Sequence, residues 1–329
     1  MKQGQIINGY LVVSRPSNAN AGKCVWAFAE KDGEEYFIKE FLDPKRPRPD
    51  SMGSVEDKKR RYAECQRFER RHQKLIRMLP ADDLHAGNLV LARDFFAEGT
   101  RYYKVSARIH GEDITPAELA PHQQLVLLRT LADSLQLLHG RGIVHGDLRP
   151  DNVMLHRPRG SDLYTAKLID FDDAYPAGEP PARDQIGGSP LYGAPEWLRY
   201  LRGDTAVTPA ALTQAVDMFA FGLLVHTYLF GVLPRHDHAY ESPASAVIDR
   251  APLAWHQGLD PALTRLLTAL TDADLLKRPD ITETAHILAG LTPFVATSAQ
   301  PSRVRINVDG RKSSAAGSRL RVNVTGRKP

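Results

Sequence analysis

The chain has 329 residues, of which 42% are hydrophobic and 25% charged, an ordinary composition for a globular protein with a sizeable core. The opening residues lack the basic start, apolar run and cleavage site of a signal peptide, and two cysteines are too few for a disulfide framework. The longest apolar stretch, Met218 to Leu233, is shorter than the roughly 20 residues of a membrane helix and predicts a buried core helix. These features predict a cytoplasmic protein without a membrane partner. The positive net charge, +4 overall, lies after Pro301, where eight basic residues face one acid.

Strands dominate the first hundred residues. Alternating apolar and polar side chains predict five strands, at residues 6–14, 25–30, 35–41, 89–96 and 102–109. A turn at Lys31-Asp32-Gly33 joins the second strand to the third. After a Pro-rich basic linker, residues 43–50, apolar residues at helical spacing predict a helix from Val55 to Leu79.

Helices dominate the second half. Pro121 opens a helix that Gly140 and Gly142 end, and residues 209–233 and 260–291 are mostly helical by their periodicity. A β-rich half before a helical half predicts an α+β fold with two lobes, an N-lobe over about 1–108 and a C-lobe over about 109–291.

A linker over residues 292–302 precedes a basic tail, residues 303–329, that contains a tandem repeat. Each copy, Arg303 to Lys312 and Arg319 to Lys328, alternates apolar and polar residues as a half-buried strand does. The two strands can pair as a hairpin whose basic face holds an acidic or phosphorylated regulatory partner, and nucleic acid is not the expected one. A disordered basic tail remains the alternative.

The segment from Ile143 to Leu155 carries the clearest chemical signal. Asp147 precedes Asn152 by five residues between two short apolar runs, which resembles the protein kinase catalytic loop, H-x-D-x-x-x-x-N. The resemblance implies that Asp147 orients the attacking hydroxyl and accepts its proton, that Asn152 holds a Mg²⁺, and that Arg149 steadies the γ-phosphate of ATP.

Asp170-Phe171-Asp172 follows an apolar strand and resembles the kinase metal-binding motif, with Asp in place of its Gly. Asp170 is thereby implied as a second Mg²⁺ ligand beside Asn152, because this ion prefers oxygen ligands. Asp172 and Asp173 are expected to be solvated acids of the loop.

Tyr36 to Lys39 resembles the V-A-I-K strand of kinases, which implies that Lys39 holds the α- and β-phosphates of ATP. Glu69, on the helix predicted over 55–79, is the favoured ion-pair partner of Lys39; Glu64, another residue, or no ion pair stay open. Ala107 and Ile109, where the strand over 102–109 ends, are expected to line the nucleotide site.

The phosphate-covering loop departs furthest from the family. Asn18, Asn20 and Lys23 stand where the glycines of G-x-G-x-x-G would fall. Because Asn tolerates positive φ, Asn18 and Asn20, together with Gly22, are expected to approach the phosphates through their backbone N–H groups. A hairpin that has lost contact with the nucleotide is the alternative.

The His-Gly-Asp-Leu wording at His145 also resembles aminoglycoside and choline phosphotransferases. Three later segments, which those enzymes generally lack, resemble protein kinases: residues 187–196, 217–222 and 277–279. Their Glu196, Asp217 and Arg278 are expected to be structural. The resemblance therefore favours a bacterial-type Ser/Thr protein kinase that uses ATP and Mg²⁺ on protein substrates. A small-molecule phosphotransferase and a nucleotide-binding pseudokinase scaffold are the alternatives.

Gly146 occupies the position at which kinases controlled by loop phosphorylation usually carry Arg. Between Asp170 and Glu196 the hydroxyl side chains are those of Tyr175, Ser189 and Tyr192. Ser189 matches a residue that is structural or faces the substrate. The sequence predicts activity without phosphorylation of this segment.

Overall fold

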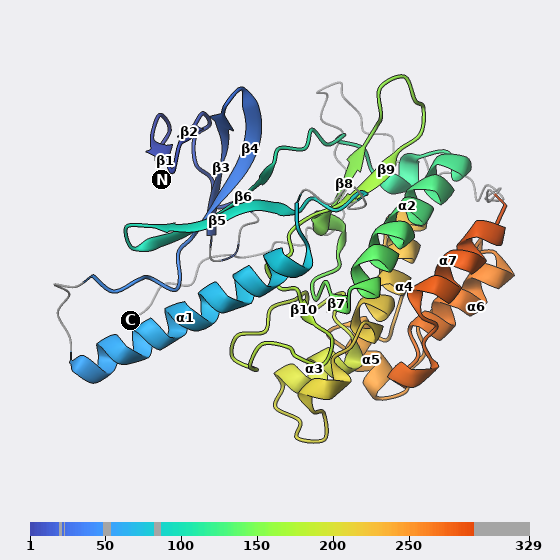
Figure 1. Cartoon of the computed structure of the whole chain (residues 1–329). Coiled ribbons are helices and arrows are strands. Elements are labelled where there is room, and N and C mark those ends of the chain that lie inside the picture. Colours follow the sequence, from blue (N-terminus) through green and yellow to red (C-terminus); the bar gives the residue numbers. More distant parts are fainter. Residues whose placement is uncertain (20–21, 23, 49–53, 82–86, 293–329) are drawn as a thin grey trace, which may run out of the picture. The chain divides into compact units, whose positions relative to one another are not determined.

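The alternating residues of the first half pair into a six-stranded antiparallel sheet, ordered β1-β2-β3-β4-β6-β5, in the computed structural model (Figure 1). The structure describes residues 1–19, 22, 24–48, 54–81 and 87–292. The strands of this sheet are β1 (Ile6–Ile7), β2 (Tyr10–Val12), β3 (Cys24–Lys31), β4 (Glu34–Phe41), β5 (Ala92–Glu98) and β6 (Arg101–Ala107).

The strand predicted over residues 6–14 is two strands. Asn8 and Gly9 both adopt positive φ, at 47° and 84°, and reverse the chain between β1 and β2. Asn and Gly are the residues that tolerate this conformation in a tight turn, so the short-range signal outweighed the alternation on either side. The predicted turn between β3 and β4 is confirmed, with Asp32 and Gly33 at positive φ.

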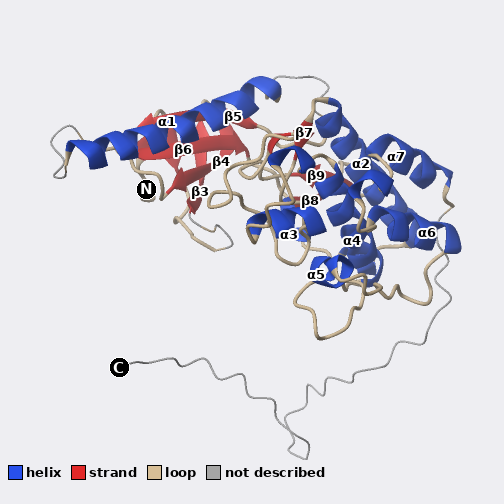
Figure 2. Ribbon diagram, turned by 90° about the horizontal axis from the view of Figure 1, so that it is seen from below, coloured by secondary structure: helices blue, strands red, loops and turns tan. Residues whose placement is uncertain are grey.

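Helix α1 (Val55–Met78) runs along one face of the sheet, as Figure 2 shows, and confirms the helix predicted over these residues. Ser54 caps its first turn by accepting a hydrogen bond from the Asp57 N–H at 3.1 Å. Its buried residues are Cys65, His72 and Leu75. An aromatic cluster joins the helix to the sheet, because the rings of Phe68 and His72 pack against those of Phe41 and Phe95.

Helices and short strands make up the second half, and most of its hydrophobic residues belong to one core. The α-helices are α2 (Pro121–Gly140), α3 (Pro195–Leu201), α4 (Ala215–Phe230), α5 (Pro243–Ile248), α6 (Pro261–Leu270) and α7 (Ile281–Gly290). Four short strands form two antiparallel pairs: β7 (Ile143–Val144) with β10 (Tyr175–Pro176), and β8 (Val153–His156) with β9 (Thr165–Leu168). Short 3₁₀ turns lie at Pro116–Glu118, Pro150–Asn152, Pro209–Ala211 and Leu275–Lys277. The α+β arrangement of two lobes is confirmed.

Helix α4 is the core helix predicted from the longest apolar stretch. Its residues from Val216 to His226 are all buried, and Gly231, at a φ of 74°, ends it. Among the described residues, no helix combines the length and the apolar character that crossing a membrane requires.

The described residues belong to one compact unit. The predicted linker from residue 293 onward and the predicted hairpin of the tail lie outside the described residues. Both stay predictions.

Arg278 and Glu196 form an ion pair inside the second half. Two guanidinium nitrogens of Arg278 donate to the two carboxylate oxygens of Glu196 at 2.7 and 2.8 Å, and both residues are buried. Arg278 also donates to the carbonyl oxygens of Asp272 and Ala215, at 2.9 and 2.8 Å. This pair ties α3 to the turn before α7.

Replacing Arg278 with Leu should lower the free energy of unfolding by about 3–5 kcal/mol, because Glu196 would keep a buried charge without a partner. The matched control is Arg202→Leu, which removes an exposed ion pair with Glu241 at 3.5 Å and should cost about 1 kcal/mol or less. Denaturant titration of both variants measures the two losses, and equal losses would contradict this account.

Candidate active site

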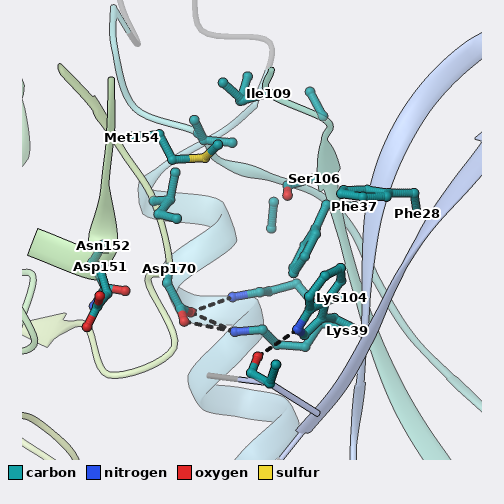
Figure 3. A pocket seen from close by; sticks show the side chains of 16 residues that line it. Phe28, Phe37, Lys39, Lys104, Ser106, Ile109, Asp151, Asn152, Met154 and Asp170 are labelled. Carbon is teal, nitrogen blue, oxygen red and sulfur yellow. Dashed lines mark hydrogen bonds and ion pairs between the residues drawn. The ribbon is translucent and has the colours of Figure 1, made fainter. Parts of the chain in front are cut away.

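A cavity of about 380 Å³ lies between the sheet and the strands that follow α2 (Figure 3). Its walls are mostly apolar, and charged or amide side chains gather at one end. The apolar lining residues are Ala19, Trp26, Phe28, Phe37, Val90, Ala92, Ala107, Ile109, Met154 and Ile169. Ala107 and Ile109 both line this cavity, and their contact with a nucleotide stays a prediction. An apolar slot with a charged end suits a flat base joined to phosphates.

Two lysines from neighbouring strands supply the positive charge at this end. Lys39 on β4 and Lys104 on β6 are paired in the strand register, and both line the cavity. The Lys39 Nζ lies 2.9 Å from both carboxylate oxygens of Asp170, as Figure 3 shows, and Lys104 lies 3.8 Å from the nearer one. Lys39 and Asp170, predicted from separate motifs, are brought together. Lys104 was missed, although a lysine in the middle of the strand Tyr102-Tyr103-Lys104-Val105 was a usable signal.

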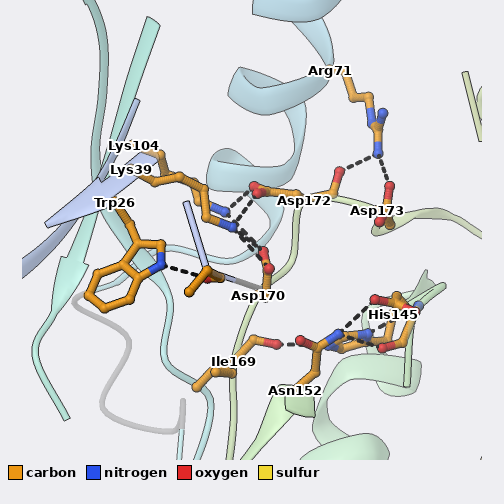
Figure 4. Close-up of polar contacts among 12 residues, drawn as sticks. Trp26, Lys39, Arg71, Lys104, His145, Asn152, Ile169, Asp170, Asp172 and Asp173 are labelled. Atoms are coloured by element: carbon orange, nitrogen blue, oxygen red, sulfur yellow. Dashed lines mark hydrogen bonds and ion pairs between the residues drawn. The ribbon is translucent and has the colours of Figure 1, made fainter. Parts of the chain in front are cut away.

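Asp172 bridges the two lysines (Figure 4). One carboxylate oxygen accepts from Lys39 at 2.7 Å and the other pairs with Lys104. Burial alone would raise the pKa of Asp172, but the ammonium groups of Lys104 and Lys39 outweigh burial and hold this pKa well below its usual range. The expectation of a solvated acid is wrong, since the side chain is only 19% exposed.

Asp173 is also half-buried rather than solvated. Its carboxylate lies 3.9 Å from the guanidinium of Arg71, a residue of α1. Burial raises the pKa of Asp173 to about 6, with the neighbouring carboxylates of Asp172, Asp147 and Asp170 adding to the shift and Arg71 opposing it.

Glu69 is not placed as predicted. Its carboxylate accepts a hydrogen bond from the Tyr102 hydroxyl at 2.7 Å and lies 3.7 Å from Arg46. The carboxylates within ion-pair distance of Lys39 are those of Asp170 and Asp172 instead. The predicted Lys39–Glu69 ion pair is therefore corrected, because α1 directs this glutamate toward β6 and the linker that precedes the helix.

The loop after β7 places Asp147 beside Asn152. The Asn152 side-chain amide donates to the Asp147 carbonyl at 2.7 Å and to its carboxylate at 2.9 Å. The other carboxylate oxygen, Oδ1, is buried and has no hydrogen-bond partner among the described residues. Burial raises the pKa of Asp147, although His145 and Arg149 oppose the shift. A fixed carboxylate with one free acceptor suits a group that receives a proton.

A buried aspartate of α4 holds this loop in place. The Asp217 carboxylate accepts from the backbone N–H groups of His145 and Gly146 at 2.7 and 3.0 Å, and it lies 2.9 Å from the ring of His139. The His145 Nε2–H donates to the Ile169 carbonyl at 3.1 Å, next to Asp170. Asp170 itself adopts a φ of 60°, a conformation that non-glycine residues hold mainly where the surrounding structure imposes it.

Arg149 pairs with Asp151, two residues further along the loop. Its side chain is 38% exposed, whereas Asp151 and Asn152 line the cavity. The contact joins Arg149 to a residue that lines the cavity, and its predicted role toward the γ-phosphate stays a prediction.

The loop before β3 places one residue on the cavity wall, and the predicted approach of its backbone N–H groups to phosphates stays a prediction. Asn18 and Gly22 are exposed, and the cavity is lined by Ala19 between them. The Ala19 carbonyl accepts from the indole N–H of Trp26 at 2.9 Å, which fixes the loop to the aromatic wall. Asn20 lies outside the described residues.

Asn152 and Asp170 fit a Mg²⁺ site by their donor chemistry. The Asn152 amide nitrogen is engaged by Asp147, which leaves its oxygen for another partner, and Asp170 adds a carboxylate on the same cavity. Within the described ranges, no group of three or more His, Cys, Asp and Glu side chains could hold a metal by itself. A Mg²⁺ ion here would therefore share its coordination with phosphates and water, as this ion commonly does.

The fold and the site together have the layout of the protein kinase-like class: a cavity of about 380 Å³, a lysine on the sheet, and an Asp-Asn loop. The family comparison agrees, because the model of the protein kinase domain matches residues 20–287. The chain belongs to the protein kinase domain family.

Several curated proteins are similar to the chain. Serine/threonine-protein kinase pkn2 of Myxococcus xanthus is 31% identical over 225 residues, which is 63% of this chain and 26% of that protein. Serine/threonine-protein kinase ULK3 of Rattus norvegicus is 33% identical over 239 residues, or 69% of this chain and 46% of that protein. Pkn1 of Myxococcus xanthus is 29% identical over 199 residues, or 59% and 27%. The match with the two Myxococcus kinases thus spans about a quarter of their length.

The backbone around Gly146 leaves no room for the Arg that kinases controlled by loop phosphorylation usually carry at this position. It has a φ of 80°, and a Cβ there would lie 2.6 Å from the Asp173 carbonyl oxygen. Both the conformation and the space exclude a side chain at this position.

Gly146→Ala should therefore lower stability by clearly more than Gly142→Ala and should reduce turnover. Gly142 also has positive φ, at 69°, but a Cβ there meets nothing within 4 Å, so this control isolates the conformational cost of about 1–2 kcal/mol. Thermal unfolding compares the two variants, and equal shifts would show that the Asp173 carbonyl yields without cost.

Proposed function

We propose that the chain is a Ser/Thr protein kinase that transfers the γ-phosphate of ATP to hydroxyl groups of protein substrates. The observation that carries this proposal is the carboxylate of Asp147: Asn152 holds one oxygen beside the cavity, and the other is buried without a partner in the described part of the chain. The names of the similar proteins support the Ser/Thr class.

Each residue of the site has a part in this proposal. Asp147 accepts a hydrogen bond from the attacking hydroxyl through its free oxygen and takes up the proton as the phosphoryl group transfers. Lys39 holds the phosphates by charge, and Asn152 and Asp170 are the residues that would hold Mg²⁺. When bound, the metal ion offsets the negative charge of the phosphates. The apolar wall that includes Ala107 and Ile109 holds the base and excludes water.

Three contacts of the second half support a protein rather than a small molecule as the acceptor. The segment from Gly187 to Glu196 is anchored by the Glu196–Arg278 pair, and the Trp197 indole N–H donates to the Gly187 carbonyl at 2.9 Å. Ser189 is buried in the same segment and accepts from the Leu191 N–H at 3.3 Å. An ordered platform of this kind, next to the Asp147 loop, suits an extended peptide.

The hydroxyls of this segment are poorly placed for regulation by phosphorylation. Tyr175, Ser189 and Tyr192 are buried, with 2%, 6% and 8% of their surface exposed. We propose that the enzyme is active without phosphorylation of the segment. Location in the cytoplasm and an acidic or phosphorylated partner for the basic tail also stay proposals, carried by the sequence alone.

Asp147→Asn should lower kcat by about a hundredfold to ten-thousandfold and leave ATP affinity near that of the wild type, because the residue acts on the acceptor hydroxyl. Asp170→Asn should weaken both turnover and Mg²⁺-dependent ATP binding. Labelled-phosphate transfer to a generic protein and calorimetric titration with ATP measure the two effects. Wild-type rates in either variant would disprove the assignment.

Treatment of the purified chain with a phosphatase should leave its kinase activity unchanged, since no buried hydroxyl of the segment is expected to carry phosphate. Mass spectrometry of the treated protein checks that phosphate is absent. Loss of most activity, regained when Ser189 is rephosphorylated, would overturn this prediction.

A further inference from the structure

The end of the cavity holds two lysines where the kinase resemblance predicts one. Lys39 and Lys104 face each other across β4 and β6, and their side chains are only 9% and 14% exposed. Two ammonium groups so close together and so little hydrated repel one another, so their position depends on carboxylates that lie against both.

Helix α1 does not supply that carboxylate. Its buried residues, Cys65, His72 and Leu75, include none among the described residues. Among these, His72 carries a titratable ring, but burial lowers its pKa to about 3, so its ring is neutral at physiological pH. That ring packs on Phe95 and Phe41, with centroids 4.7 and 5.1 Å apart.

The segment after β9 supplies the carboxylates instead. Asp170 binds Lys39 with both oxygens, but it is also the residue that fits a metal ion. Asp172 contacts each lysine with a separate oxygen, and it is less exposed than Asp170, 19% against 34%. Asp172 is therefore the partner that can stay on Lys39 when Asp170 has another ligand.

Helix α1 contacts this segment through a cation and not through a carboxylate. Arg71 of α1 donates to the backbone carbonyl of Asp172, so a cation of the helix holds the main chain that presents the carboxylate, as Figure 4 shows. The likeness to protein kinases predicts a different contact, an ion pair between a glutamate of the helix and the lysine itself.

We propose that Asp172, held by Lys104 and by Arg71, is the positioning residue that sets Lys39 for the phosphates of the nucleotide, in the place that a helix glutamate was expected to fill. The inference rests on the proposed function and adds to it. It assigns a role to the aspartate that replaces glycine in the metal-binding motif and to a second lysine, Lys104.

The first test compares Asp172→Asn with Glu69→Gln in the full chain. Asp172→Asn should lower kcat by about tenfold to a hundredfold, because a small displacement of Lys39 misplaces the reacting phosphate. Its KM for ATP should not rise, since the variant leaves both lysines in place and removes a negative charge. Glu69→Gln should keep kcat within about threefold of the wild type, and so should the control Asp184→Asn, an exposed acid of the same segment. The reverse ranking of Asp172 and Glu69 would overturn the proposal.

The second test separates positioning from simple charge balance. Asp172→Asn should lower Tm, because it leaves two buried ammonium groups facing one carboxylate. Adding Lys104→Met removes one of them and should restore Tm, whereas kcat should stay low because Lys39 still lacks its partner. Recovery of kcat together with Tm would show that Asp172 only neutralises the lysines, and would also overturn the proposal.

Both tests use release of phosphate from ATP as well as transfer to a protein acceptor. A wild-type chain that hydrolyses ATP but phosphorylates no protein would contradict the proposed function alone, and the ranking of the variants would still decide the role of Asp172. If neither reaction is detected, the Tm values, measured with and without ADP, decide it. The proposal expects ADP to raise the Tm of Glu69→Gln by as much as it raises the Tm of the wild type. A smaller rise in Glu69→Gln would contradict the proposal.

Discussion

The carboxylate of Asp217 is the contact on which the geometry of the site depends. Buried in α4, it accepts from two consecutive backbone N–H groups of the loop that carries Asp147. A buried carboxylate without such donors would be costly, and the two N–H groups would also lack partners. The loop and the core helix therefore fix one another, and the position of Asp147 depends on this buried helix. Asp147 in turn fixes the side chain of Asn152 by a hydrogen bond. His145, in the same loop, donates to the carbonyl of Ile169 and so links the loop to the residue before Asp170.

Two kinds of interaction hold the residues of the site in place. The Asp147–Asn152 pair is held by hydrogen bonds to the helical half, whereas Lys39 and Lys104 come from the sheet and meet the other half through salt bridges. Hydrogen bonds to buried backbone fix a position closely. Ion pairs depend on distance more than on direction, so they adapt to a change of ligand at lower cost. Such a division lets one half orient the acceptor hydroxyl and the other half adjust to the phosphates.

Short motifs with fixed spacing predicted most of the site. Asp147, Asn152, Asp170 and Lys39 converge as expected because each lies within a few residues of a strand whose place the alternation of residues reveals. The partner of Lys39 could not be predicted in the same way. Glu69 has the right residue type on the right helix, but the rotation of α1 depends on the packing of Phe68 and His72 between Phe41 and Phe95, and neighbouring residues in the sequence do not encode that contact.

The two acids after Phe171 illustrate the same limit. Composition alone predicts solvated side chains for Asp172 and Asp173, since acidic residues in loops usually face water. Their burial follows from cations on distant elements, Lys39, Lys104 and Arg71. The fold itself was easier to predict, because the sheet and the core helix α4 depend on patterns of many residues, in which one misjudged turn, such as that at Asn8 and Gly9, does little harm.

The lack of space for a side chain at Gly146 bears on how control of the proposed kinase could evolve or be engineered. In kinases controlled by loop phosphorylation, a single arginine at that position usually binds the phosphate on the neighbouring segment. Here the backbone of Asp173 occupies the space, and Asp173 in turn abuts Gly187, where a Cβ would lie 2.1 Å from its carboxylate. Installing the arginine would require the segment around Asp173 to move first, and that segment also carries Asp172. Control by phosphorylation of this segment would thus require several coordinated substitutions. Control by a partner that binds outside the catalytic domain, or by a change in abundance, requires fewer changes in this segment.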